Sequence, residues 1–117
     1  MKELHKKALQ AYIEMLTIHI DTKTTDPVFH PATEEMYEAL FEVAHKLGEK
    51  HVDLGGNLID DSLESKKSQA VSILENLKKD IEDHHASNDV TLGTEDLLGS
   101  LANTLEDNIG NAKAFVK

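Results

Sequence analysis

The chain is short, acidic and free of cysteine, and these properties exclude several classes of protein. Its 117 residues suffice for one compact domain, 1–117. A net charge of −10 repels phosphate backbones and attracts cations, so direct DNA binding is disfavoured, although the acidity alone would also fit a merely well-solvated surface. Without cysteine there is no disulfide framework and no thiolate metal site. No apolar run has the length of a signal peptide or a bilayer span, so we expect a cytoplasmic protein with no membrane partner.

The apolar residues recur at helical spacing from the first turn onward. Aromatic residues make up only 4% of the chain, and Leu, Ile, Ala and Val carry most of its hydrophobicity, which favours helices over a sheet. The first predicted helix covers residues 3–23 and ends in the TKTTDP stretch. Its apolar stripe contains Leu4, Ala8, Tyr12, Met15, Leu16 and His19, widened by Leu9, Ile13 and Ile20.

The second predicted helix, 31–53, begins with Pro31 in its first turn and ends where Gly55 or Gly56 can adopt the left-handed conformation. An earlier start with Asp26 as the N-cap is also possible. Its apolar face contains Met36, Leu40, Phe41, Val43, Ala44 and Leu47.

Two further helices are predicted at 62–85 and 95–116. Asp60, Asp61 or Ser62 can cap the third helix, and Thr94 is the expected N-cap of the fourth. The expected core positions of the third helix are Ala70, Ile73, Leu74, Leu77 and Ile81. Gly99 and Gly110 interrupt the fourth helix, where glycine would permit close helix approach. Four amphipathic helices with short connections predict an all-α fold, a four-helix bundle.

Candidate metal ligands gather on one face of the second helix. At about 100° per residue, His30, Glu34, His45 and Glu49 fall within roughly 100° of arc. An antiparallel hairpin would also bring His19, near the end of the first helix, close to His30. Since His45 and Glu49 lie about 22 Å further along the helix, they cannot reach the same metal within one chain. A two-fold axis pairing antiparallel copies of this helix would place them beside the partner's His19 and His30. Mixed imidazole and carboxylate ligands suit iron or zinc.

Three segments carry a resemblance to a known family: LTIHI, the run from FHPATEEM to HVDLGG, and TEDLLGSLANTLEDNIGNAKAFV. They resemble the Dps family, the ferritin-like proteins that protect DNA during starvation stress. The resemblance implies a ferroxidase centre at a two-fold dimer interface, iron oxidation by peroxide, and iron storage in a homo-oligomeric shell of twelve subunits. It implies that His19, His30 and Glu34 of one chain join His45 and Glu49 of its partner.

The chain departs from the family pattern at three places. His45 stands where the family has Asp, which lowers the ligand charge, and we expect this to shift the preference from iron toward zinc or another divalent metal. The long crossover with its short helix is missing, and so is the basic tail used for DNA contact. Residues 53–62 could span roughly 33 Å when extended, just enough for a ferritin-like path between helices two and three. The alternative is an up-down-up-down bundle, and the match in the fourth helix favours the ferritin-like path.

Other interpretations stay open at this point. The acidic residues of the second helix could form a solvated face, and the chain could be a non-catalytic assembly or regulatory protein that has lost ferroxidase function. His84-His85 with Asp89 invites a hemerythrin-like interpretation, but the paired histidines that this would need on the third helix are missing. His84 and His85 more simply meet the negative end of that helix. His5, Tyr12 and His19, seven residues apart, form a partly buried seam on the first helix.

Overall fold

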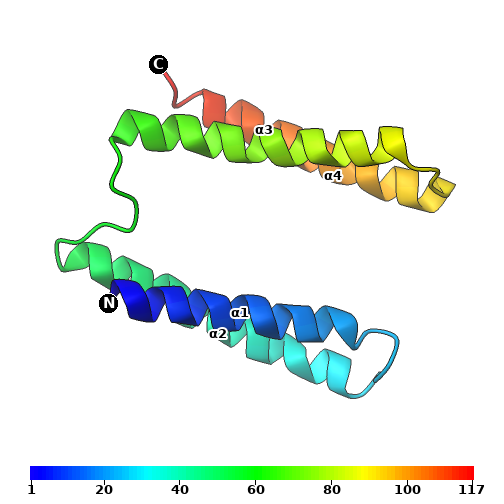
Figure 1. Ribbon diagram of the computed structural model, residues 1–117, viewed down its shortest axis with the longest axis horizontal. Helices are drawn as coiled ribbons and strands as arrows, with labels where there is room; N and C mark the ends of the chain where they lie inside the picture. Colours follow the sequence, from blue (N-terminus) through cyan, green and yellow to red (C-terminus); the bar gives the residue numbers. More distant parts are fainter. The chain divides into compact units, whose positions relative to one another are not determined.

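The computed structural model describes all residues, 1–117, and contains four α-helices and no strand (Figure 1). The helices are α1 (Lys2–Asp21), α2 (Phe29–Asp53), α3 (Leu63–Ser87) and α4 (Leu92–Lys113). The all-α class and the four predicted helices are confirmed, with every boundary within three residues of its predicted place. None of these helices combines the length and hydropathy that a membrane-spanning segment requires.

The helices pack as two hairpins, each of which is a compact unit. Residues 1–60 contain α1 and α2, which run side by side, and residues 61–117 contain α3 and α4 (Figure 1). This pairwise packing supports the four-helix-bundle class. The ferritin-like path from α2 to α3, and the single domain that it would complete, stay predictions.

The first hairpin buries a narrow stripe. Its most buried residues are Thr33, Ala44 and Gly48 of α2. The residues of α1 along one face are half-buried. Several positions predicted for the apolar stripes are instead exposed, namely Leu4, Leu9, Ile13, Ile20, Met36, Phe41 and Val43. Within the hairpin each helix meets only one other helix, so only the residues that face that partner are covered.

The second hairpin is organised around Val71, its only buried residue. The prediction that Ile73 and Leu77 are core residues is wrong for this hairpin, because they lie 67% and 52% exposed. Ion pairs also join its helices: Nζ of Lys78 lies 3.0 Å from Oε1 of Glu106. Hydrogen bonds to Glu106 and then Glu82 raise the pKa of Lys78 above its ordinary value.

The glycines of α4 do not have the predicted role within this hairpin. A Cβ atom added at Gly99 or Gly110 would meet nothing within 4 Å, so neither position is a point of close helix approach here.

Side chains and one glycine define the helix ends. Ser62 caps α3 through its hydroxyl, which accepts from the Ser65 N–H at 3.0 Å. Gly55 has φ of 92° and ends α2 in the left-handed region, as expected. The predicted N-cap of α4 is wrong: α4 begins at Leu92, and Thr91 caps it by accepting from the Thr94 N–H at 3.2 Å. Because Thr91 is followed three residues later by another threonine, either side chain suited the cap pattern.

Replacing the true cap should cost more than replacing the predicted one. We expect Thr91→Ala to lower the free energy of unfolding by about 1 kcal/mol, because the Thr94 N–H loses its acceptor. Thr94→Ala should cost less, since its hydroxyl only meets the exposed Thr91 hydroxyl at 3.0 Å. Urea unfolding followed by circular dichroism measures both, and a larger loss for Thr94→Ala would contradict the assignment.

Candidate functional site

Two stacked imidazole rings join α1 and α2 at the end of the first hairpin where the connecting loop lies. The ring centroids of His19 and His30 are 4.0 Å apart, and the ring planes differ by 20°. Nδ1 of His19 lies 2.8 Å from the His30 carbonyl oxygen, and Nδ1 of His30 is hydrogen-bonded in return to the His19 carbonyl oxygen. We call this reciprocal pair the imidazole clasp. It confirms the predicted proximity of the two histidines.

The clasp satisfies a backbone carbonyl that the end of α1 leaves open. The His19 carbonyl lies in the last turn of α1, where carbonyls have no partner within the helix. His30 supplies a donor there, and Thr22 adds another from its hydroxyl at 3.1 Å. The two histidines therefore stabilise the hairpin as well as lining its surface.

Thr33 of α2 supports the clasp with its hydroxyl and is fully buried. Its hydroxyl donates to the His30 carbonyl at 2.7 Å and lies 3.0 Å from Nδ1 of His19. The sequence pattern did not single out Thr33, because a threonine in a helix is an ordinary residue until its neighbours are known.

These contacts determine the tautomer of both rings when they are neutral. A carbonyl oxygen only accepts hydrogen bonds, so Nδ1 must carry the proton in each ring. The lone pair of each neutral imidazole then resides on Nε2. Histidine ligands in metal sites commonly have this arrangement, with one ring N–H held by a carbonyl and the other nitrogen available to the metal.

The acidic and aromatic groups beside the clasp shape its electrostatics. Glu34 is exposed one turn after His30 on α2, and no hydrogen bond ties its carboxylate to the clasp. The Tyr37 ring lies 4.9 Å from the His19 ring. Burial raises the pKa of Tyr37 above its ordinary value, and the negative charge of Glu34 adds to this effect. A proton on the phenol is thus favoured next to the clasp.

His45 and Glu49 form a second group further along α2. Nε2 of His45 lies 3.4 Å from Oε1 of Glu49, and both side chains are mainly exposed, at 59% and 65%. At 1.5 Å per residue, the 15 residues from His30 to His45 separate this pair from the clasp by about 22 Å. The structure thus brings His19 and His30 together, and His45 and Glu49 together, but not the two pairs within one chain.

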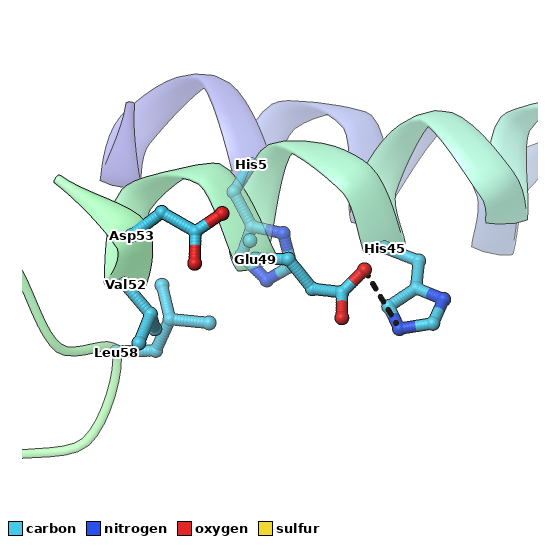
Figure 2. Close-up of a pocket in the computed structure, with 7 residues that line it drawn as sticks. His5, His45, Glu49, Val52, Asp53 and Leu58 are labelled. Carbon is cyan, nitrogen blue, oxygen red and sulfur yellow. Dashed lines mark ion pairs between the residues drawn. The ribbon is translucent and has the colours of Figure 1, made fainter.

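Beside the second pair, a pocket of about 330 Å³ is lined by a histidine that was not among the candidate metal ligands predicted from the sequence (Figure 2). The pocket is lined by His5, His45, Gly48, Glu49, Val52, Asp53 and Leu58. His5 comes from the first turns of α1, and its Nδ1 lies 2.7 Å from the Ala44 carbonyl oxygen. In these side-chain positions, no three His, Asp or Glu side chains of the chain are arranged to hold a metal ion.

The remaining histidines have local structural contacts. Nε2 of His51 lies 3.1 Å from the Asn57 carbonyl oxygen, which ties the end of α2 to the following loop. His84 and His85 lie in the last turn of α3, as expected, and His85 is 3.7 Å from Glu95.

Comparison with known proteins gave no match, whether to a family model, to a curated protein or to a solved structure.

The Thr33 hydroxyl should contribute measurably to the stability of the first hairpin. We expect Thr33→Val, which keeps the side-chain shape, to lower the free energy of unfolding by about 1 kcal/mol or more, because a buried hydrogen bond is lost. Thr17→Val is the matched control, since its exposed hydroxyl makes a similar bond to the Ile13 carbonyl at 2.8 Å. Urea unfolding should show a change within about 0.5 kcal/mol for the control. Equal effects of the two substitutions would contradict the role of Thr33.

Proposed function

We propose that this chain is a Dps-like, ferritin-like protein that binds divalent metal between two subunits and oxidises and sequesters iron there. One half of each centre consists of His19, His30 and Glu34 of one chain. The other half consists of His45 and Glu49 of a second chain. The observation that carries the proposal is the imidazole clasp.

The clasp supports the proposal because it prepares two neighbouring nitrogen ligands. Both rings keep Nδ1 engaged with backbone carbonyls, so Nε2 is the atom that each neutral ring offers to a metal. The rings are held by groups of the backbone and by the buried Thr33, so their orientation is established before any metal arrives. Glu34, one turn along the same helix, can add a carboxylate oxygen by rotation of its exposed side chain.

The second half-site supports a shared centre in a different way. His45 and Glu49 are exposed and are already paired with each other at 3.4 Å. A two-fold axis across α2 would set this pair against the clasp of the other chain, because antiparallel copies exchange the two ends of the helix. Such a dimer contains two identical centres, each with histidine and carboxylate ligands from both chains.

The ligand set also determines what the centre does. Iron is the substrate: each ferrous ion gives up one electron, and peroxide accepts two electrons and two protons as its O–O bond breaks to give two waters. The residues bind and orient the ions, and the two carboxylates, Glu34 and Glu49, offset the increased charge of the ferric product. The net charge of −10 favours the approach of cations. His45 offers an imidazole nitrogen where the resemblance expects the carboxylate of Asp, which makes zinc the main competitor of iron.

Mixing two inactive variants tests whether the centre is shared. His30→Ala and Glu49→Ala chains, each alone, should show no ferrous oxidation by peroxide above background. When they are unfolded together in urea and refolded, mixed dimers contain one intact centre, so about a quarter of the wild-type rate should return.

A matched mixture provides the control for this experiment. His19→Ala and His30→Ala remove ligands from the same half-site, so no pairing of these chains restores a centre. The shared centre would be contradicted if oxidation returned equally in both mixtures. It would also be contradicted if wild type were active and oxidation returned in neither mixture. A monomeric solution mass with no oxidation by wild type would favour the non-catalytic assembly or regulatory protein instead.

A further inference from the structure

His5 is seated against α2 in a position that a glycine makes possible. Its ring lies so close to Gly48 that a Cβ atom there would stand 2.9 Å from both Cε1 and Nδ1 of His5. Glycine within a helix costs about 1 kcal/mol relative to alanine, and Gly48 lies well inside α2. The contact therefore depends on one residue of each helix: His5 on α1, and a glycine at position 48 of α2.

The backbone then orients the ring of His5. Nδ1 donates to the Ala44 carbonyl at 2.7 Å, so the lone pair of the neutral ring resides on Nε2. This is the same arrangement that orients His19 and His30, at the opposite end of the hairpin. His5 lines the pocket together with His45, Glu49 and Asp53. Figure 2 shows the His5 ring behind the Glu49 side chain, whose carboxylate reaches toward His45.

The geometry points to a second metal site: we propose that His5, His45 and Glu49 of one chain bind a divalent cation of the zinc class in this pocket. His5 supplies a nitrogen whose position is established by the backbone. His45 and Glu49 are one turn apart and mainly exposed, so rotations of these two side chains bring their ligand atoms toward Nε2 of His5. Asp53, one turn beyond Glu49, can hold the fourth position or a water molecule in it.

The ligand types select the class of metal. Two imidazoles and one carboxylate with a fourth open position are a set that zinc binds in proteins, and cobalt and nickel bind similar ligands. Calcium and magnesium prefer oxygen ligands and are disfavoured by the two nitrogens. The site needs only one chain, so it goes beyond the shared centre. It uses the same His45 and Glu49, so this pair serves either the pocket or the shared centre at one time.

Zinc titration of the full chain by isothermal calorimetry tests the site. We expect each chain to bind one zinc ion in this pocket. This binding should persist in His30→Ala, which removes a ligand of the shared centre but none of the pocket. Binding should weaken at least about tenfold in His5→Gln and in Glu49→Gln, since even residues that only support a ligand commonly have effects of that size. His84→Ala, which removes a histidine of α3, should bind zinc like wild type.

A substitution that keeps every ligand tests the seating of His5. Gly48→Ala places a methyl carbon 2.9 Å from Cε1 and Nδ1 of His5, so the ring must shift and its hydrogen bond to the Ala44 carbonyl is disturbed. We expect the helical content to be kept and zinc binding to weaken at least about tenfold. Gly99→Ala is the matched control, because its added methyl meets nothing within 4 Å, and it should bind zinc like wild type.

The outcomes separate this site from the shared centre. Zinc binding that is lost in His30→Ala and kept in His5→Gln would overturn the single-chain site and assign the metal to the shared centre. Zinc binding that is unaffected by both His5→Gln and Glu49→Gln would overturn it as well. Since Glu49 is exposed, its substitution by Gln tests the ligand even if His5→Gln disturbs the packing of α1 on α2.

Discussion

The hydrogen bond from an imidazole Nδ1 to a backbone carbonyl is the interaction on which the chemistry of the first hairpin depends. It occurs at three histidines: His5 donates to Ala44, His19 to His30, and His30 to His19. Each bond crosses between α1 and α2, so it fastens the helices together and selects the ring tautomer in the same step. Interhelical packing and the orientation of the imidazole nitrogens are therefore the same feature of this molecule.

The three rings lie at the two ends of one narrow interface. At the loop end, the buried Thr33 hydroxyl supports the clasp, and at the other end Gly48 makes room for His5. Carboxylates stand near both ends on the exposed face of α2, but no end gathers a complete set of ligands in the positions seen. Each end of the interface therefore has an imidazole nitrogen in a fixed orientation, beside carboxylate side chains that can rotate. Completion comes from a second chain at the clasp, in our proposal, and from side-chain rotation at His5.

The periodicity of the sequence predicted the helices well because that pattern is local. The caps at Ser62 and the left-handed Gly55 followed from the same local rules. Burial was predicted less well: Ile73 and Leu77 have the right spacing for a core but are exposed, since the spacing does not say how wide a stripe one neighbouring helix covers. The N-cap of α4 was misplaced because Thr91 and Thr94 fit the same rule.

The candidate site was also predicted in part, where it depends on local sequence, and missed where it depends on how the two helices pack. An antiparallel hairpin predicted that His19 and His30 meet, and they do. His5 was interpreted only as part of a seam, because its contact with Ala44 spans 39 residues and depends on how α1 slides along α2. Gly48 was the available signal, since a glycine inside an amphipathic helix can mark a close neighbour. It does so at Gly48, where the neighbour is the His5 ring, but not at Gly99 or Gly110. Thr33 gave no comparable signal.

The tautomers of the three histidines test this account most directly. Nitrogen-15 chemical shifts of the imidazole rings, measured by two-bond proton–nitrogen correlation at a pH where the rings are neutral, distinguish a proton on Nδ1 from one on Nε2. The account predicts Nδ1–H for His5, His19 and His30, whereas a neutral ring in water slightly favours the Nε2–H form. Finding the proton on Nε2 of these three rings would contradict the hydrogen bonds to Ala44, His30 and His19, and with them the orientation of the nitrogen ligands in both proposed metal sites.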